Sequence, residues 1–266
     1  MKKHLVKGVF GIAVALFFCL SSVLSAFAVN GTNCINWYCI REKNHMQPQL
    51  DSTLSIINDY QCLYIDKNHS TYEDDLVVYL TFDVGYENGN VSRILDTMND
   101  NEVQGAFFVL GNLLNKNPTL IKRMLDEGHL VCNHTYSHRD MTKCEGIADF
   151  KEELDRLSEA FRKLTGRDIS KFYRPPEGKF NAKGLEYAQE LGYTTVFWSF
   201  AYADWDNAKQ PSSEKAFRII MDNIHNGAIL LLHPTSSTNA DILDRVIRTL
   251  KEGGFRFGSL DEIQVD

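Results

Sequence analysis

Residues 76–83 read Leu-Val-Val-Tyr-Leu-Thr-Phe-Asp, a short apolar run rich in strand-forming residues that ends on a carboxylate. From this run onward, similar runs alternate with segments that have helical periodicity. The strand candidates are Leu76–Phe82, Ala106–Leu110, Leu130–Asn133, Phe172–Arg174, Thr194–Phe200, Ala228–Leu232 and Phe255–Phe257. The helix candidates between most of them are Val91–Met98, Leu120–Asp126, Phe150–Leu164, Gly184–Leu191, Glu214–Ile224 and Ile242–Lys251.

This alternation predicts the fold class. Strands that alternate with amphipathic helices pair in parallel through crossover connections. Seven strand candidates within about 190 residues therefore predict an α/β fold, a closed or nearly closed (β/α) barrel that is somewhat short of the eight-stranded form. In such barrels the reactive side chains lie at the C-terminal ends of the strands and on the loops that follow.

Unusual polar residues stand at these positions in five of the runs. Asp83 ends the first run, His134 follows the third, and Arg174 ends the fourth. Asp204 follows the fifth run, and His233 directly follows the sixth. One such residue alone carries little weight, but five in the same register predict a single site at one end of the barrel.

The N-terminus differs in composition from the rest of the chain. Three lysines precede an almost uninterrupted apolar stretch, Gly8–Leu24, and Ser25–Ala28 supplies small residues at the spacing of a cleavage site. Residues 1–28 are therefore predicted to be a secretory signal peptide. An uncleaved membrane anchor is the alternative, since the stretch is near the lower length limit for a spanning helix. Either interpretation places the rest of the chain outside the cytoplasm.

Composition and charge narrow the function classes. The chain is 44% hydrophobic and 24% charged, as in an ordinary soluble globular protein. Removal of residues 1–28 would take away three lysines and no acidic residue, so the formal net charge would move from −7 to −10. A domain this acidic has no general attraction for nucleic acid or anionic lipid. Residues 29–75 are irregular and are predicted to be a lead segment that packs on the main domain, residues 76–266.

His134 and His138 are candidates for metal ligands. Four residues apart on a helical turn, both imidazoles would lie on one face and could bind one cation, with zinc as the expected ion. An isolated pair with this spacing is more often two surface histidines on a loop. Cys132 shares the strand face of His134 and is an alternative additional ligand, although a cysteine flanked by Leu130 and Val131 is more often part of the core.

Asp83 and Arg174 are candidates for a reactive carboxylate and its partner. Asp83 leaves an apolar strand for a glycine turn, where it could act as a general base near a reacting water or simply cap the loop. Arg174 is followed by two prolines that stiffen the chain. A fixed guanidinium could pair with Asp83 and keep it ionised and oriented, although an Arg-Pro-Pro turn is more often structural.

His233 and Asp204 form a second candidate pair. A histidine whose second nitrogen is held by a carboxylate is a tuned acid or base. In isolation, His233 would be interpreted as a satisfied core histidine and Trp205 as ordinary packing. Their position at the same end of the barrel as Asp83 and the two other histidines favours a functional role.

Together these residues resemble the polysaccharide deacetylase family, also called NodB-homology or carbohydrate esterase family four, over roughly Val77–Glu262. The family's five motifs occur in order: Thr81-Phe82-Asp83-Val84-Gly85, His134 with His138, Arg174-Pro175-Pro176-Glu177-Gly178, Asp204-Trp205 and Leu231-Leu232-His233. The resemblance implies a distorted seven-stranded (β/α) barrel, in agreement with the strand count. It also implies a metal-assisted polysaccharide N-deacetylase, a hydrolase that acts on linear amide C–N bonds.

The resemblance further implies a role for each site residue. Four would act in catalysis, with Asp83 as general base oriented by Arg174, and His233 as general acid oriented by Asp204. His134 and His138 would hold a divalent metal ion, expected to be zinc. The substrate pocket would be formed by Glu177, whose backbone N–H stabilises the oxyanion, by Trp205 and Leu231 around the acetyl methyl group, and by Tyr86.

The similarity is greatest to one branch, the δ-lactam-biosynthetic deacetylases that act on muramic acid during spore cortex formation. Three stretches carry it: Gly85-Tyr86-Glu87-Asn88-Gly89, Phe197–Asp206, and Asn36-Trp37-Tyr38 with Asn44-His45. The implied function is de-N-acetylation of peptidoglycan N-acetylmuramic acid, leading to muramic δ-lactam. Alternatives that use the same residues are a peptidoglycan N-acetylglucosamine deacetylase and an O-acetyl esterase. An alternative of another class is an inactive glycan-binding protein on the same fold.

Val84 departs from the family pattern. Most members have a second aspartate here as a metal ligand, and the δ-lactam branch usually has an asparagine, whereas valine has no lone pair to offer. The metal would rest on two histidines with water, substrate or Asp83, so we expect weaker binding than in other members, since zinc sites ordinarily have three protein ligands. The expected partner is peptidoglycan glycan strands. We expect a monomer at the cell wall or spore cortex, with no nucleic acid and no membrane contact except through an uncleaved signal peptide.

Overall fold

The computed structural model describes residues 31–69 and 75–264. The predicted signal peptide, residues 1–28, lies outside these ranges. Within them, no helix is both long enough and apolar enough to cross a membrane.

Strand β3 (Leu76–Val84) lies at the centre of the sheet. Its β-branched and aromatic side chains suit a strand that is covered on both faces. Every residue of the strand is buried except Leu76 and Asp83, which are partly exposed. β3 pairs in parallel with β10 (Ala228–Leu232) on one side and with β4 (Ala106–Val109) on the other. β11 (Phe255–Phe257) pairs with the first residues of β3.

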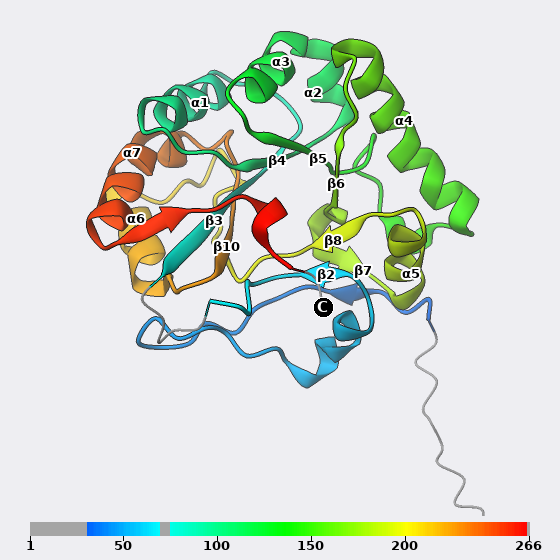
Figure 1. Cartoon of the computed structure of the whole chain (residues 1–266), viewed down its shortest axis with the longest axis horizontal. Helices are drawn as coiled ribbons and strands as arrows, with labels where there is room; N and C mark the ends of the chain where they lie inside the picture. Colours follow the sequence, from blue (N-terminus) through cyan, green and yellow to red (C-terminus); the bar gives the residue numbers. More distant parts are fainter. Residues whose placement is uncertain (1–30, 70–74, 265–266) are drawn as a thin grey trace, which may run out of the picture.

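The other strands extend this centre into a curled parallel sheet (Figure 1). Its order is β2-β8-β6-β5-β4-β3-β10-β9, with β11 beside β3. The additional strands are β2 (Cys62–Leu63), β5 (Leu130–Asn133), β6 (Ser170–Tyr173), β8 (Thr194–Val196) and β9 (Phe200–Ala201). A separate antiparallel pair joins β1 (Ile35–Asn36) to β7 (Lys179–Phe180). The predicted α/β class with a barrel-like parallel sheet is confirmed. The sheet has nine strands instead of the predicted seven, because the short strand β2 was not predicted and one predicted run supplies two strands.

One strand candidate differs from the prediction. The run Thr194–Phe200 is divided between β8 and β9, because residues 197–199 leave the strand ladder. β8 pairs with β2 and β6, whereas β9 pairs with β10 at the other end of the strand order. This one stretch of chain therefore joins the two ends of the curled sheet, and the N–H of Ser199 donates to the carbonyl of Ile229 in β10.

Seven α-helices of the described ranges cover the outside of the curled sheet (Figure 1). They are α1 (Asn90–Asp100), α2 (Gly111–Lys116), α3 (Pro118–Asp126), α4 (Ile147–Thr165), α5 (Ala182–Glu190), α6 (Ser213–Asn223) and α7 (Ser237–Glu252). Short 3-10 helices are η1 (Ser52–Asp59), η2 (Met141–Lys143), η3 (Pro176–Gly178) and η4 (Leu260–Glu262). Each predicted helical segment coincides with an α-helix. Only α2 was missed, because its six residues are too few to show a period.

The alternation of side chains along β3 divides the core into two layers. Val78 and Leu80 pack with the helices, whereas Val77 and Tyr79 belong to a second cluster on the inner side of the curled sheet. Because successive side chains of a strand point to opposite faces, Asp83 shares the inner face with Val77 and Tyr79. Asp83 therefore reaches the interior of the barrel at the C-terminal end of β3.

Residues 31–69, which include β1 and β2, run along one edge of the domain (blue to cyan in Figure 1), where β1 pairs with β7 and β2 pairs with β8. Their apolar side chains form a cluster with β7, α5 and the residue after β8, made of Trp37, Leu54, Ile57, Tyr64, Ile65, Phe180, Leu185 and Phe197. Gln47 anchors this segment near the start of β10, since its Nε2 donates to the carbonyls of Asp66, His69 and Asn226.

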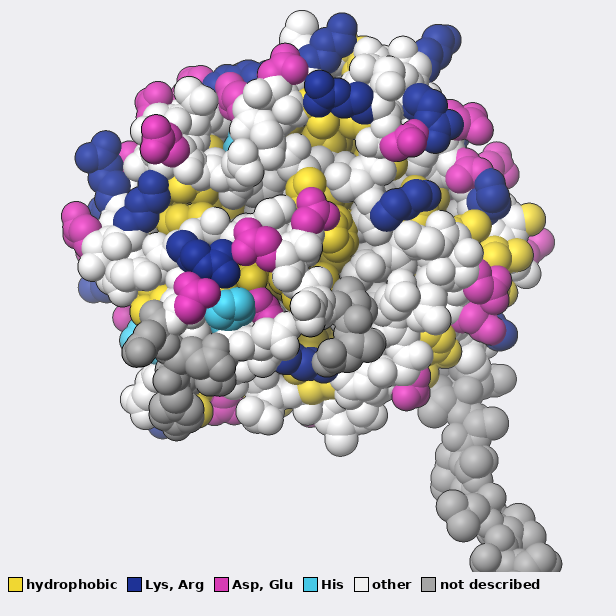
Figure 2. Space-filling view, in the orientation of Figure 1, with side chains coloured by type: hydrophobic (Ala, Val, Ile, Leu, Met, Phe, Trp, Pro, Cys, Tyr) yellow, Lys and Arg dark blue, Asp and Glu magenta, His cyan; other side chains and the backbone are white. Residues whose placement is uncertain are grey.

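The molecular face in Figure 2 carries charges of both signs. Lysine and arginine side chains are interspersed with aspartate and glutamate around its rim. Many charged residues of the described ranges form exposed pairs, such as Arg93 with Asp241 and Arg245 with Glu214. Exposed pairs of this kind contribute little to the free energy of unfolding, so the mixed surface is a matter of solubility more than of stability.

Candidate active site

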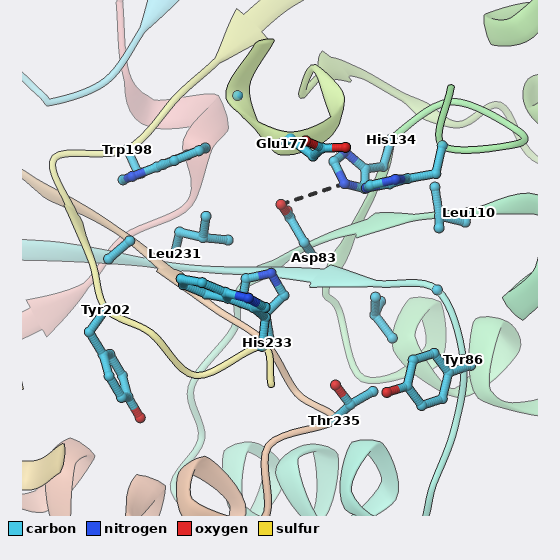
Figure 3. Close-up of a pocket in the computed structure, with 16 residues that line it drawn as sticks. Asp83, Tyr86, Leu110, His134, Glu177, Trp198, Tyr202, Leu231, His233 and Thr235 are labelled. Carbon is cyan, nitrogen blue, oxygen red and sulfur yellow. Dashed lines mark ion pairs between the residues drawn. The ribbon is translucent and has the colours of Figure 1, made fainter. Parts of the chain in front are cut away.

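A cavity of about 830 Å³ opens at the C-terminal ends of the strands (Figure 3). It is lined by Asp83, Val84, Gly85, Tyr86, Leu110, His134, His138, Glu177, Gly178, Trp198, Ala201, Tyr202, Trp205, Leu231, His233 and Thr235. All but two of the site residues predicted from the sequence are among them. The two others, Arg174 and Asp204, are fully buried and contact lining residues from behind.

Asp83 and Arg174 form a buried ion pair. Nη1 of Arg174 donates to Oδ1 of Asp83 across 2.8 Å. Other N–H groups of the guanidinium donate to the carbonyls of Val196 and Phe197 and to Oγ1 of Thr81. These bonds hold the guanidinium in one position, as a buried charge requires. Asp83 is therefore oriented as well as paired.

The charge of Arg174 governs the ionisation of Asp83. Burial alone would raise the pKa of this carboxyl, but the charge of Arg174 is the largest of several contributions that together outweigh burial. The pKa of Asp83 is consequently lowered from its ordinary value, and the carboxylate is ionised at neutral pH. A fixed, ionised and partly desolvated carboxylate is suited to accept a proton.

His134 turns an unprotonated nitrogen toward Asp83. Its Nδ1 lies 2.8 Å from the carbonyl oxygen of Arg174 and donates its proton there, since a carbonyl can only accept. Nε2 then carries the lone pair, and it lies 3.6 Å from Oδ2 of Asp83 (dashed line in Figure 3). Burial lowers the pKa of His134 to about 4, so the ring is neutral at pH 7. Two acceptors thus face each other across a gap that suits a cation.

His138 approaches the cavity from a loop. The prediction that residues 134–138 form a helical turn is wrong, because Thr135 and His138 have positive φ values of 71° and 61°. The N–H of His138 donates to Oγ1 of Thr135, and the N–H of Ser137 donates to Oε2 of Glu153. These side-chain acceptors favour the loop over the helix. The ring centroids of His134 and His138 nevertheless lie 5.1 Å apart.

His233 and Asp204 form a second pair on the same cavity. Nδ1 of His233 donates to Oδ1 of Asp204 across 2.7 Å, and the backbone N–H of His233 donates to Oδ2 across 2.8 Å. Burial lowers the pKa of His233, but the hydrogen bond and the charge of Asp204, together with the charge of Asp83, outweigh it and raise this pKa. In Figure 3 the ring of His233 lies beside Asp83.

Asn239, which holds Asp204, and Tyr202, which holds Asn239, were not predicted from the sequence as parts of the site. Asn239, in the first turn of α7, donates from Nδ2 to Oδ2 of Asp204 across 2.6 Å and to the carbonyl of His233 across 3.1 Å. Its Oδ1 accepts from the hydroxyl of Tyr202. Oδ2 of Asp204 therefore receives two N–H donors, which fixes the carboxylate. The signal in the sequence was an asparagine beside the apolar positions of a helix, where a polar residue needs a partner.

The turn after Arg174 carries Glu177 to the edge of the cavity. Glu177 lies in η3 with a left-handed φ of 58°, and its carboxylate pairs with Nζ of Lys179 across 2.7 Å. Gly178 follows with a φ of 66°. A β-carbon on Gly178 would lie 2.8 Å from Cη2 of Trp198, so only glycine allows the turn to pack against this ring.

Aromatic side chains form the rim of the cavity. Trp205 is 61% exposed and Tyr86 is 45% exposed. The hydroxyl of Tyr86 accepts from Nδ2 of Asn207 across 2.8 Å, whereas Leu231 is buried in the wall. Exposed aromatic rings beside a concave polar site provide apolar faces for an organic ligand.

The donor atoms around the cavity fit a divalent cation in part. Nε2 of His134, the ring of His138 and Oδ2 of Asp83 are the candidates. In residues 31–69 and 75–264, however, no three His, Cys, Asp or Glu side chains are arranged as a complete set of ligands. Cys132 does not join them, because it is buried in the inner cluster of the sheet. Val84 packs its side chain in the core on the helical side.

The comparison with known families assigns this site to a class of enzyme. The sequence profile described as polysaccharide deacetylase matches residues 71–196, which include Asp83, His134, His138 and Arg174. The chain belongs to the polysaccharide deacetylase family, as the resemblance implied. It is therefore a hydrolase of the class that cleaves the N-acetyl amide bonds of a polysaccharide.

Individual relatives refine this assignment. Peptidoglycan-N-acetylmuramic acid deacetylase PdaA of Bacillus subtilis is 39% identical over 87% of this chain and 86% of its own length. Its solved structure superposes on this one with a TM-score of 0.82, covering 87% of this chain and 97% of the PdaA chain. A peptidoglycan-N-acetylglucosamine deacetylase of Bacillus cereus is 33% identical over 69% of this chain and 66% of its own. A Bacillus anthracis structure described as a pseudoenzyme of carbohydrate esterase family four is 27% identical, with a TM-score of 0.67, over 77% of this chain and 69% of that one.

Proposed function

We propose that this protein removes the acetyl group from N-acetylmuramic acid in peptidoglycan with the help of a divalent metal ion, and that the product leads to muramic δ-lactam in spore cortex. One observation carries the proposal. Two oppositely tuned groups share a cavity, Asp83 with a lowered pKa beside Arg174 and His233 with a raised pKa beside Asp204. At neutral pH the first can accept a proton and the second can supply one, which amide hydrolysis requires.

Proton transfer is divided between these two pairs. Asp83 takes a proton from the water that attacks the acetamide carbonyl, and Arg174 keeps the carboxylate ionised and aimed. His233 gives a proton to the amine that leaves the sugar, and Asp204 holds the ring so that Nε2 is free toward the cavity. The amine would otherwise be a poor leaving group, so both transfers are needed in one turnover.

Metal binding is assigned to the two histidines. His134 and His138 would hold the ion, expected to be zinc, with Asp83 beside them. When bound, the ion would polarise the acetamide carbonyl and acidify a water molecule. The carbonyl of Arg174 orients His134 by accepting the Nδ1 proton, an arrangement common among metal-binding histidines.

The pocket residues position the acetyl group. The backbone N–H of Glu177 donates to the oxyanion that forms on the carbonyl, as the matching family motif implies. Leu231 and Trp205 surround the methyl group, and Tyr86 lies at the rim where the glycan would pass. A cavity of about 830 Å³ has room for a sugar residue together with its acetyl group.

N-acetylmuramic acid is favoured as the substrate because the Bacillus subtilis relative named for this substrate is similar over 87% of the chain. The same residues could act on N-acetylglucosamine, the substrate for which the Bacillus cereus relative is named. Peptidoglycan lies outside the cytoplasm, so the proposal requires export, and the predicted signal peptide supplies it.

The test uses purified protein stripped of metal by a chelator and then incubated with peptidoglycan glycan strands, with and without zinc. Acetate release and the masses of digested products are followed together. The proposal expects acetate in the presence of zinc and loss of an acetyl group from muramic acid. If only glucosamine lost its acetyl group, the proposed substrate would be wrong, but the proposed reaction, de-N-acetylation, would still hold.

A glycan-binding protein without activity is the second candidate, because Val84 supplies no metal ligand and a pseudoenzyme exists among the relatives. The two ordered ion pairs argue against it. A protein that only binds has no use for a buried arginine that keeps Asp83 ionised or for a carboxylate that raises the pKa of His233. Saturable glycan binding without acetate release under any divalent metal would favour this candidate.

A further inference from the structure

Three residues that line the cavity are held by donors from the lead segment. The carbonyl of Gly178 accepts from the backbone N–H of Trp37 at 2.8 Å. The carbonyl of Trp198 accepts from Nε1 of Trp37 at 2.9 Å. The carbonyl of Ala201 accepts from Nη2 of Arg41 at 2.6 Å. Both donor residues precede residue 71, where the match to the family profile begins.

Trp37 is itself rigidly placed. Its side chain is 6% exposed, and its ring stacks on Phe197 with centroids 4.4 Å apart and an interplanar angle of 19°. A β-carbon on Gly178 would lie 3.1 Å from Cβ of Trp37 and 2.8 Å from Cη2 of Trp198. The turn that carries Glu177 is therefore packed between two indole side chains, and Trp37 hydrogen-bonds to both the turn and the second indole residue.

Arg41 holds the other end of the same cavity wall, which is formed by Glu177, Gly178, Trp198, Ala201 and Tyr202. Its guanidinium lies over the ring of Phe200, 5.3 Å from the centroid, while it donates to the carbonyl of Ala201. Phe200 and Ala201 form β9, which pairs with β10. Tyr202 follows directly, and its hydroxyl contacts the asparagine that orients Asp204.

We infer that Trp37 and Arg41 are positioning residues for deacetylation, and that the lead segment is part of the active site although it does not touch the reacting atoms. This inference rests on the proposed function, because it concerns the wall of the same cavity. Trp198 lies in the interruption between β8 and β9, where the N–H groups of its neighbours Phe197 and Ser199 donate to the carbonyls of Leu63 and Ile229. The donors of Trp37 and Arg41 add to these bonds at the carbonyls of Trp198 and Ala201, and they thereby set the distance between the Glu177 turn and the opposite wall.

The two positions have different expected kinetic effects. Nε1 of Trp37 holds the carbonyl of Trp198, whose ring packs against the turn that carries the oxyanion donor, so loss of this indole donor should lower kcat. Arg41 acts on the wall beside the bound sugar, so its loss should raise KM. Because a displacement of about 1 Å can cost about 100-fold in rate, we expect each effect to be about 10-fold.

The experiment compares conservative variants. Trp37→Phe keeps a ring on Phe197 and the backbone N–H to Gly178, but it removes the indole donor to Trp198. Arg41→Met keeps the aliphatic stem and removes the donor, whereas Arg41→Lys keeps a cationic donor and should recover part of the loss. Kinetic constants are measured by acetate release, and the exchange of backbone amides in residues 177–179 and 198–202 is measured by hydrogen–deuterium exchange.

Gln47→Ala is the matched control. Gln47 lies in the same lead segment and also donates to three carbonyls, but its acceptors, in Asp66, His69 and Asn226, are not among the residues that line the cavity. This variant should lower the melting temperature while leaving kcat, KM and the exchange of the wall amides unchanged. Comparison with this variant therefore distinguishes a general loss of stability from a displacement of the cavity wall.

The inference holds if Trp37→Phe and Arg41→Met accelerate amide exchange in the wall and shift kcat and KM as stated, beyond the effect of Gln47→Ala. It is overturned if their kinetics match those of Gln47→Ala at the same loss of melting temperature, or if exchange in the wall is unchanged. Amide exchange needs no activity. A wild-type protein that released no acetate would therefore refute the proposed function, while exchange would still decide whether the lead segment holds the wall.

Discussion

Replacement of Asp204 by asparagine is expected to remove the acid function of His233 and to preserve the fold. The two side chains have the same shape, and Asp204 is fully buried. Oδ2 of Asp204 receives two N–H donors, from the backbone of His233 and from Nδ2 of Asn239. The amide oxygen of the new asparagine must take this place, because an NH2 group there would face two donors. The NH2 group is then directed at Nδ1 of His233.

This arrangement reverses the hydrogen bond at His233. Nδ1 would have to accept, so the neutral ring would carry its proton on Nε2. Burial lowers the pKa of His233, and Asp204 is the principal partner that raises it, so loss of this carboxylate leaves burial to dominate. The reaction uses the protonated ring, and activity is therefore lost as the pH rises through the pKa of His233. In Asp204→Asn that loss should begin at a lower pH than in the wild type.

The magnitude follows from the value of proton transfer. A positioned general acid contributes about 100- to 10,000-fold to the rate, and the variant keeps every other group of the site, so we expect kcat to fall by about 1,000-fold at neutral pH. KM should change little, because Asp204 is buried behind His233 and does not line the cavity. Acetate release measured on either side of neutral pH reports both quantities.

Two results would refute this reasoning. One is near-normal turnover in Asp204→Asn, and the other is an alkaline limb of the pH profile at the wild-type position. Thermal unfolding of each variant shows whether lost activity reflects unfolding. Thr238→Val is a suitable control, because Thr238 lies beside Asn239 and donates to the carbonyl of Pro211. Its loss should lower stability and leave the pH profile unchanged.

Three further changes test other parts of the site. Asp83→Asn removes the base and leaves Arg174 without its carboxylate, so acetate release should fall by about 100- to 10,000-fold; turnover near the wild-type value would contradict the assignment. His134→Ala removes the imidazole nitrogen that faces Asp83, and isothermal titration should show that zinc binding is lost, whereas unchanged affinity would move the metal elsewhere. Gly178→Ala places a β-carbon against Trp198 at a positive φ, and urea unfolding should show a loss of about 2 kcal/mol, with an unchanged midpoint as the contrary result.

The sequence predicted the strands well because their signal is local. The run at Leu76–Phe82 is apolar and rich in β-branched residues, so it indicates a buried parallel strand without reference to the rest of the chain. Asp83 and His233 could be selected from the same local signal, since each is a polar residue placed directly at the end of a buried apolar run. The ends of parallel strands meet at one edge, and this geometry brought the selected residues to one cavity.

The failures concern contacts between distant parts of the chain. The loop at residues 134–138 depends on Glu153 in α4, and a spacing of four residues could not distinguish it from a helical turn. Trp37 and Asn239 serve the site through partners more than 30 residues away in sequence. Trp37 stands in a stretch that the resemblance singled out, but that stretch does not show which residues Trp37 contacts, and Asn239 stands in none of the family motifs. Val84 could be recognised as a departure from the family pattern, but only the structure shows that its side chain packs on the helical side of the sheet.

Arg174 takes its position from an irregularity of the sheet. Its guanidinium donates to the carbonyls of Val196 and Phe197, at the point where β8 ends and the chain crosses to β9. An uninterrupted strand would commit these carbonyls to neighbouring strands, and the arginine would lose two of the acceptors that aim it at Asp83. Redesign of residues 197–199 as a continuous strand would thus remove two hydrogen-bond acceptors of Arg174, even if it raised the stability of the sheet. The same loss opposes any evolutionary change that makes this part of the sheet regular.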